Sequence, residues 1–139
     1  MSMSIQIPDC FYRVSVKALV VNSSNRFLLV REENGLWELP GGGLDFGEKP
    51  QEGLRRELME EMALEVKSIS DHPHYFFPAI NPKGQHIVNA VYATEFYHLD
   101  FRPSDECLEI RFFSPDEVFE IKEWMYPNVL EFAKIYKMT

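Results

Sequence analysis

The sequence predicts a single α/β domain that spans residues 1–139. Three observations support this fold class. A chain of 139 residues is long enough to bury one core. Its composition, 45% hydrophobic and 26% charged, is that of an ordinary globular protein. Apolar strand-like runs and helical periodicities occur together, with no repeat, low-complexity tract or linker to divide the chain.

Strands are expected first. Residues 12–22 (YRVSVKALVVN) are apolar and β-branched and predict a long central strand. The turn NSSN leads to a returning strand at residues 26–32, and a short strand at 36–40 (LWELP) ends at Pro40. We expect the three glycines at 41–43 to form a loop, because glycine tolerates positive φ angles that other residues avoid.

Two longer helices are expected. The first begins near Pro50, a residue suited to the first helical turn. Leu54, Leu58 and Met62 recur every four residues and give this helix an apolar stripe. Residues 126–138 predict a closing amphipathic helix. Its apolar side would be formed by Val129, Phe132, Ala133 and Tyr136.

The remaining elements lie in the second half of the chain. Strand candidates occupy residues 64–77, 85–99 and 107–113, and Pro, Asn and Gly turns separate them. Ser114 and Glu117 have the spacing of a capping box, which predicts a short helix that starts at Ser114.

Charge and composition exclude several classes of function. The formal charge of −8 argues against a broad nucleic-acid surface, because a basic face is needed to neutralise phosphates. No run approaches ~18 apolar residues, so we expect no membrane span. The N-terminus lacks a basic region followed by an apolar run, so no signal peptide is expected. Cys10 and Cys107 are isolated, and we interpret them as reduced thiols in a cytoplasmic protein.

Three glutamates are crowded on the first helix. Glu57, Glu60 and Glu61 fall within an arc of about 100° beside the apolar stripe. Their mutual repulsion costs roughly 0.2–0.5 kcal/mol per pair on an exposed helix, and more when partly desolvated. A bound cation would relieve it, and a site of carboxylates alone suits Mg²⁺ or Mn²⁺. The alternative is a solvated acidic helix face without a ligand.

The spacing around these glutamates resembles the Nudix box, G-x5-E-x7-R-E-U-x-E-E-x-G-U, where U is aliphatic. The matching residues are Gly42, Glu48, Arg56, Glu57, Leu58, Glu60, Glu61 and Leu64. Such a match would arise by chance in on the order of one chain in 10⁴. Ala63 stands where the family has glycine, and this departure affects only the turn at the helix end.

The resemblance implies a Nudix-type α/β/α sandwich with a mixed sheet between helices. It also implies hydrolysis of a nucleoside diphosphate linked to another group, by water attack at phosphorus. By this resemblance Glu57, Glu60 and Glu61 hold Mg²⁺ or Mn²⁺, with the carbonyl of Gly41 as a further ligand. Subgroups of the family differ in substrate, and the short chain favours a small nucleotide such as a nucleoside triphosphate.

The same resemblance assigns roles around the metal site. Arg56 orients Glu57 and pairs with Glu48, which a guanidinium can bind through two bonds. The general base stays open: it is Glu60 or Glu61, or a glutamate from a distant segment. For that distant glutamate the candidates are Glu106 and Glu109, and an ordinary cross-strand surface role is an equal alternative for Glu109.

Substrate contacts are expected from a few further residues. Arg31 could bind phosphate, and Phe46 and Phe76 could stack on a nucleobase. Two other functions remain open: a catalytically silent regulatory Nudix domain that binds a nucleotide, and an acidic-helix interaction protein. The presence of all three box glutamates favours an active enzyme. The resemblance also allows a homodimer.

Overall fold

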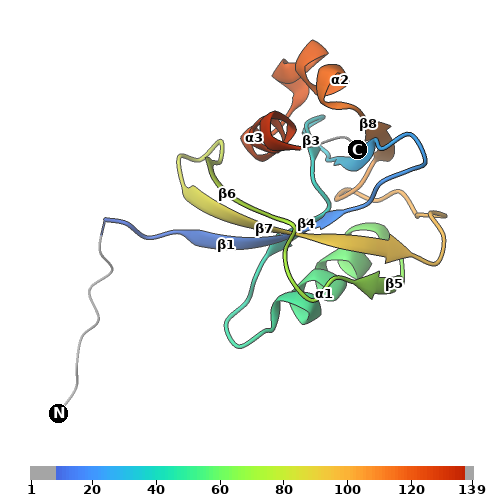
Figure 1. Cartoon of the computed structure of the whole chain (residues 1–139), viewed down its shortest axis with the longest axis horizontal. Helices are drawn as coiled ribbons and strands as arrows, with labels where there is room; N and C mark the ends of the chain where they lie inside the picture. Colours follow the sequence, from blue (N-terminus) through green and yellow to red (C-terminus); the bar gives the residue numbers. More distant parts are fainter. Residues whose placement is uncertain (1–8, 137–139) are drawn as a thin grey trace.

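The computed structural model describes residues 9–136, and Figure 1 shows a β-sheet with helix α1 on one side and α3 on the other. The strands are β1 (Arg13–Leu19), β2 (Phe27–Arg31), β3 (Trp37–Glu38), β4 (Gly41–Gly43), β5 (Val66–Ile69), β6 (Tyr75–Ile80), β7 (His86–Phe96) and β8 (Glu109–Phe113). The helices are α1 (Pro50–Met62), α2 (Pro115–Glu120), the 3-10 turn η1 (Lys122–Trp124) and α3 (Pro127–Ile135).

The larger sheet is mixed, as expected. Its strand order is β4-β1-β7-β5, and β6 also pairs with β7. Strands β1 and β7 run parallel over seven residue pairs, from Arg13↔Ile87 to Leu19↔Ala93, whereas β4 and β1 run antiparallel. A second sheet has the order β3-β2-β8. The sandwich of helices and mixed sheet predicted from the resemblance is confirmed.

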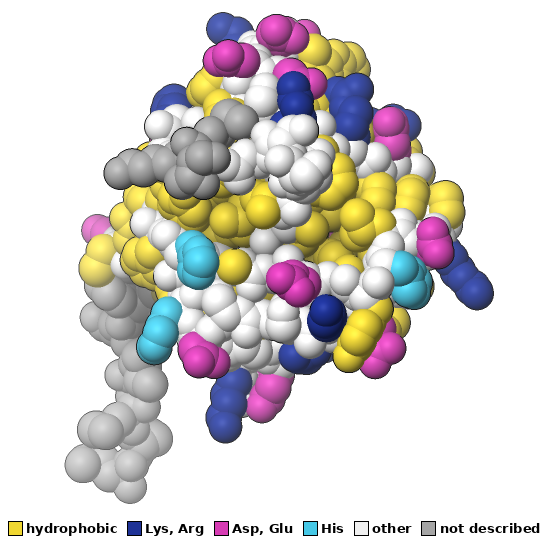
Figure 2. All heavy atoms as spheres, turned by 45° about the vertical axis from the view of Figure 1, so that its right-hand side comes forward, with side chains coloured by type: hydrophobic (Ala, Val, Ile, Leu, Met, Phe, Trp, Pro, Cys, Tyr) yellow, Lys and Arg dark blue, Asp and Glu magenta, His cyan; other side chains and the backbone are white. Residues whose placement is uncertain are grey.

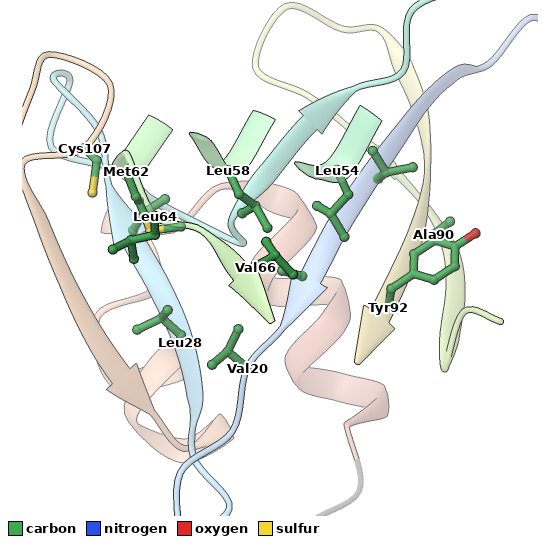
Figure 3. Packing of buried hydrophobic residues seen from close by; sticks show 13 residues of the cluster. Val20, Leu28, Leu54, Leu58, Met62, Leu64, Val66, Ala90, Tyr92 and Cys107 are labelled. Atoms are coloured by element: carbon green, nitrogen blue, oxygen red, sulfur yellow. The ribbon is translucent and has the colours of Figure 1, made fainter. Parts of the chain in front are cut away.

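Two apolar clusters fill the space between the sheet and the helices. On one side, Leu54, Leu58 and Met62 of α1 pack against β1 and β7 and are fully buried (Figure 3). Burying each of these side chains contributes about 1.5–3 kcal/mol to folding. On the other side, Phe132 of α3 meets Tyr75 of β6 edge to face, with ring centroids 5.2 Å apart. Helices α1 and α3 therefore pack on opposite faces of the larger sheet (Figure 1).

The ends of α1 follow from its sequence. Pro50 occupies the first helical turn, as predicted. The helix ends at Ala63, whose φ of 55° and ψ of 37° are left-handed and whose N–H bonds the carbonyl of Met59 at 2.9 Å. This is the position where the family has glycine, which adopts that conformation without strain. The substitution thus changes only the cap and leaves the glutamates on the helix.

The C-terminal helices also match their sequence signals. Ser114 caps α2, and the reciprocal bonds with Glu117 form the predicted capping box. In α3, Val129, Phe132 and Ala133 are buried as expected. Tyr136 follows the last turn, and the rest of the predicted helix lies outside the described residues.

Two predictions about local structure are wrong. The glycines at 41–43 form strand β4 rather than a loop, paired with β1 from Ser15↔Gly43 to Lys17↔Gly41. Residues 64–77 contain two strands instead of one, because β7 is long enough to pair with β6 in its first half and β5 near its end. Pairing with a longer partner is a tertiary effect that a local pattern does not reveal.

The surface carries charges of both signs. On the face in Figure 2, basic side chains are interspersed with acidic ones above and below a band of apolar side chains. Cys10 is exposed, Cys107 is buried, and both are free thiols. Among residues 9–136, no helix has the length and apolar character needed to cross a bilayer.

Candidate active site

An acidic cleft of about 580 Å³ lies where the second half of α1 meets β4. Its walls are Glu32, Glu33, Asn34, Gly41, Glu57, Glu61, Asp105 and Glu106. Six of these eight side chains are carboxylates, and within the described residues no lysine or arginine lines the cleft. A phosphate-bearing ligand could therefore enter only together with cations.

The glycine strand brings the backbone close to the glutamates of α1. A Cβ on Gly42 would lie 2.5 Å from Oε2 of Glu57, so only glycine leaves room for that carboxylate. Gly41 has a φ of +122°, and its N–H points to Oε1 of Glu61 at 3.3 Å. The triple glycine thus lets two carboxylates approach the sheet edge.

Glu61 is a buried carboxylate in the cleft wall, only 7% exposed. Burial raises its pKa from 4.5 to about 8, although the charge of Lys17 and the bond from Gly41 act in the opposite direction. The buried side chain therefore retains a proton at neutral pH unless a cation replaces it. This demand for positive charge is what a site for a divalent ion would satisfy.

Arg56 organises the carboxylates that flank the cleft. Its Nε and Nη2 donate to Glu48 at 2.7 and 2.9 Å, and these bonds hold the pKa of Glu48 down to about 2. Its Nη1 donates to Glu57 at 3.0 Å and to Glu60 at 3.3 Å. One guanidinium thus fixes Glu48 and orients Glu57, with the contacts expected from the resemblance.

The three box glutamates differ in their surroundings. Glu57 and Glu61 line the cleft, whereas the side chain of Glu60 is 55% exposed and does not. No three Asp, Glu, His or Cys side chains in residues 9–136 already converge as a metal-binding group. The donor set nevertheless fits a hard divalent ion, because the carboxylates of Glu57 and Glu61, both in the cleft wall, offer only oxygen ligands.

The other predicted site residues are placed differently. Glu106 lines the cleft. Glu109 does not, and it is the cross-strand partner of Arg31, with an ion pair of 3.1 Å. Arg31 is likewise absent from the cleft wall. Phe46 and Phe76 are strongly exposed and do not line the cleft either.

A second cleft, of about 460 Å³, adjoins the first and shares Glu32, Asn34 and Gly41 with it. Its wall includes four buried polar side chains. These are Ser15, Lys17, Glu38 and Asn128. The sequence analysis missed them, although Lys17 and Glu38 are charged residues inside apolar runs, which is an available signal for a buried polar site.

Three of these side chains, Lys17, Glu38 and Asn128, form a buried polar network together with Asn89. Asn89 donates to Asn128 at 2.8 Å, and Asn128 donates to Oε2 of Glu38 at 3.0 Å. Oε2 of Glu38 also lies 3.8 Å from Nζ of Lys17. Burial raises the pKa of Glu38, and Lys17 opposes that shift.

Tyr126 lines the second cleft and bonds Glu32 and Asn34, which both clefts share. Its hydroxyl donates to Oε1 of Glu32 at 2.8 Å and accepts from Nδ2 of Asn34 at 2.8 Å. Burial and the neighbouring carboxylate raise the pKa of Tyr126 to about 12. The residue just before α3 thus anchors the turn that carries Glu32.

Comparison with known proteins identifies the family of this chain. The family model described as NUDIX domain matches residues 11–132. Nudix hydrolase 25 of Arabidopsis thaliana is 28% identical, covering 91% of this chain and 79% of that protein. An ADP-ribose pyrophosphatase of Methanocaldococcus jannaschii is 30% identical over 98 residues, which cover 68% of this chain and 57% of that protein.

Solved structures agree as well. The MutT protein from Methanosarcina mazei Go1 superposes with a TM-score of 0.68 at 27% identity, and the match covers 94% of both chains. An RNA pyrophosphohydrolase of Helicobacter pylori is 36% identical over 78 residues, or 50% of its length, so the match to some relatives is partial. With a family match over most of its length and the box carboxylates beside a glycine strand, this chain belongs to the Nudix hydrolase family.

Proposed function

We propose that this Nudix hydrolase is a divalent-metal-dependent pyrophosphohydrolase. It would cleave a nucleoside diphosphate linked to another group, by water attack at phosphorus. The observation that carries the proposal is that Glu57, Glu61 and Gly41 line one acidic cleft. Among residues 9–136, no lysine or arginine side chain lines this cleft. Such a cleft repels a bare pyrophosphate, so the substrate would need divalent ions to enter.

Four groups would hold the ion. They are the carboxylates of Glu57, Glu60 and Glu61 and the carbonyl of Gly41. Mg²⁺ or Mn²⁺ would supply positive charge to the phosphoryl oxygens and acidify an attacking water. Glu60 lies outside the cleft wall and pairs with Arg56, so its side chain would have to turn toward the cleft to join this set.

The protein's own residues would orient the reactants. Arg56 holds Glu57 and Glu48 in place, which keeps the acidic wall preorganised. Burial keeps Glu61 protonated in the metal-free protein, so Glu61 would release that proton when it binds the ion. Glu106 also faces the cleft, so Glu60, Glu61 and Glu106 are the candidates for the general base, together with the more distant Glu109.

The substrate is proposed to be a small nucleotide, such as a nucleoside triphosphate. The second cleft would accept the part beyond the reacting phosphates, because it joins the first at Gly41 and has a polar wall. The relatives of this chain include an ADP-ribose pyrophosphatase and an RNA pyrophosphohydrolase, so both substrate classes belong in the test. Contacts of Arg31, Phe46 and Phe76 with substrate stay predictions.

The test is a panel of nucleoside triphosphates, nucleotide sugars, dinucleoside polyphosphates and 5′-triphosphorylated RNA, with Mg²⁺ and with Mn²⁺. Phosphate and pyrophosphate release would show which phosphorus is attacked. For any active substrate, Glu61→Gln should lower the rate by ~10²-fold or more. The matched control is Glu52→Gln on the exposed side of the same helix. An equal rate in Glu61→Gln would reject the assignment.

A different outcome would support the regulatory alternative. In that case the wild-type chain would bind a nucleotide without releasing phosphate from any member of the panel. Two further predictions accompany the proposal: one Nudix domain accounts for residues 1–139, and the protein is cytoplasmic with Cys10 and Cys107 reduced. The resemblance also allows a homodimer, which stays open. Light scattering, thiol titration of freshly prepared protein and limited proteolysis would check them.

A further inference from the structure

Lys17 is a buried lysine at the centre of the larger sheet. It lies on β1 between Val16 and Ala18, which face the core under α1. Because side chains alternate along a strand, Lys17 points to the opposite face, where α3 lies. Only 4% of Lys17 is exposed, although buried lysines are rare without strong partners. Its surroundings therefore call for an explanation.

The ammonium of Lys17 contacts the segment that leads into the glycine strand. Its Nζ donates to the carbonyl oxygens of Leu39 at 3.3 Å and Gly41 at 3.4 Å. Lys17 and Gly41 are also cross-strand partners in the pairing of β1 with β4. The two carbonyls flank Pro40, whose own carbonyl accepts from the N–H of Ala18 at 2.8 Å. Three consecutive carbonyls are thus held by β1.

This segment lies between the two clefts. On one side, the N–H of Gly41 donates to Glu61 in the acidic cleft. On the other side, Glu38 lies 3.8 Å from the same ammonium and binds Asn128 of α3. Any shift of residues 39–41 would move Gly41 relative to Glu61. The position of one wall of the acidic cleft therefore depends on a side chain that does not line it.

We propose that Lys17 is a positioning residue for the hydrolysis: it holds the segment 39–41 so that Gly41 stays in place against Glu61. The inference rests on the proposed function for its catalytic consequence. The positional part stands on geometry alone, since it concerns the two carbonyl contacts of Lys17. A purely structural lysine would stabilise the fold without a specific effect at Gly41.

The first measurement needs no substrate. In Lys17→Met, a side chain of similar length without donors, the amide of Gly41 should exchange with solvent at least about tenfold faster. The amide of Val91, in the centre of β7, should change by less than about threefold after correction for global stability. The matched control is Lys67→Met, at an exposed position of β5. In this variant both amides should exchange at their wild-type rates.

A second variant guards against unfolding. Lys17→Met leaves Glu38 buried beside no cation, which could destabilise the protein as a whole. The double variant Lys17→Met/Glu38→Gln removes both charges and should fold. Because the carbonyl contacts are still lost, Gly41 should exchange faster in this variant too. Unchanged exchange of Gly41 in the double variant overturns the proposal.

Kinetics supply the catalytic readout. With any nucleotide that the wild type cleaves, the double variant should have a kcat about tenfold or more below that of Glu38→Gln alone, because the reactants are misplaced. Glu38→Gln is the reference because Lys17 and Glu38 also line the second cleft, so a change in KM does not bear on the positioning role. Faster exchange at Gly41 with an unchanged kcat overturns the catalytic part. If the wild type cleaves no nucleotide, the proposed function fails, and hydrogen exchange still decides whether Lys17 positions Gly41.

Discussion

Arg56 binds Glu48 through two parallel hydrogen bonds, from Nε to Oε2 at 2.7 Å and from Nη2 to Oε1 at 2.9 Å. The same guanidinium reaches Glu57 through Nη1 at 3.0 Å. Since a fork-shaped cation connects the loop before α1 to a carboxylate of the cleft, its geometry matters as much as its charge. The first two predictions below depend on the position of Glu57.

The first prediction concerns Arg56→Lys. Lysine keeps the charge but cannot bind Glu48 with two donors and Glu57 with a third, so Glu57 loses its orientation. We expect catalytic efficiency to fall by about 10–100-fold. Steady-state kinetics with an active nucleotide would measure this. Arg55→Lys is the control, because Arg55 donates to the carbonyl of Val66 and does not line the cleft, so this variant should leave the rate unchanged. Equal rates in both variants would contradict the role of Arg56.

The second prediction concerns room at Gly42. A Cβ there would meet Oε2 of Glu57 at 2.5 Å, so Gly42→Ala should displace that carboxylate and lower activity by about tenfold or more. Gly84→Ala provides the contrast, because Gly84 has a φ of +81° but open space around it. That variant should lose about 1 kcal/mol of stability and keep its activity. Loss of activity in Gly84→Ala alone would refute this explanation.

The third prediction is a dependence of stability on pH in metal-free protein. The pKa of Glu61 is about 8 in the folded state and 4.5 ordinarily, so between these values the folded chain holds a proton that the unfolded chain has lost. Its contribution to stability is complete below about pH 4.5 and is lost as the pH rises through 8.

Denaturant unfolding with a chelator at pH 6, 7 and 8 would measure that dependence. Relative to Glu61→Gln, the wild type should lose up to about 1.4 kcal/mol of unfolding free energy per pH unit. Because a divalent ion replaces the proton, Mn²⁺ affinity should increase over the same range. A wild-type stability that increases with pH relative to the variant would have the wrong sign.

The fourth prediction concerns the end of α1. Ala63 is left-handed, with a φ of 55°, so Ala63→Gly removes backbone strain. We expect the free energy of unfolding to increase by roughly 0.5–1 kcal/mol, partly offset by the greater freedom of glycine in the unfolded chain. Ala133→Gly inside α3 should have the opposite sign. Thermal or denaturant unfolding of both variants would decide.

The fifth prediction separates the distant candidates for the general base. Glu106 lines the cleft, whereas Glu109 pairs with Arg31 across β8 and β2. Glu106→Gln should therefore lower kcat by about tenfold or more, and Glu109→Gln by less than about threefold. The pH profile of kcat should lose its acidic limb only if the replaced residue is the base. A larger decrease of kcat in Glu109→Gln than in Glu106→Gln would instead identify Glu109 as the base.

The fold was largely predictable because its signals are local. The stripe of Leu54, Leu58 and Met62 and the capping box of Ser114 depend on residues a few positions apart, and both were correct. The strand formed by the glycines of β4 was not predicted, because it depends on pairing with β1, a partner distant in the sequence. The division of residues 64–77 into two strands failed for the same reason.

The candidate site shows the same division. The box motif indicated Glu57 and Glu61, and both line the cleft. Lys17 and Glu38 were missed, although each is a charged residue in an apolar run, because that pattern does not show which residues they contact. Their meaning arises only when Asn128, from the last helix, joins them. Residues that act by tertiary contact cannot be recognised from spacing alone.

The contacts between Tyr126 and Glu32 span 94 residues, and those between Asn128 and Glu38 span 90. A nascent chain on the ribosome would thus expose the whole acidic motif long before its cleft could close. Until α3 emerges, the carboxylates would lack the contacts that Tyr126 and Asn128 supply to the segments around them. Completion of the cleft would therefore wait for α3, which is synthesised after the acidic motif.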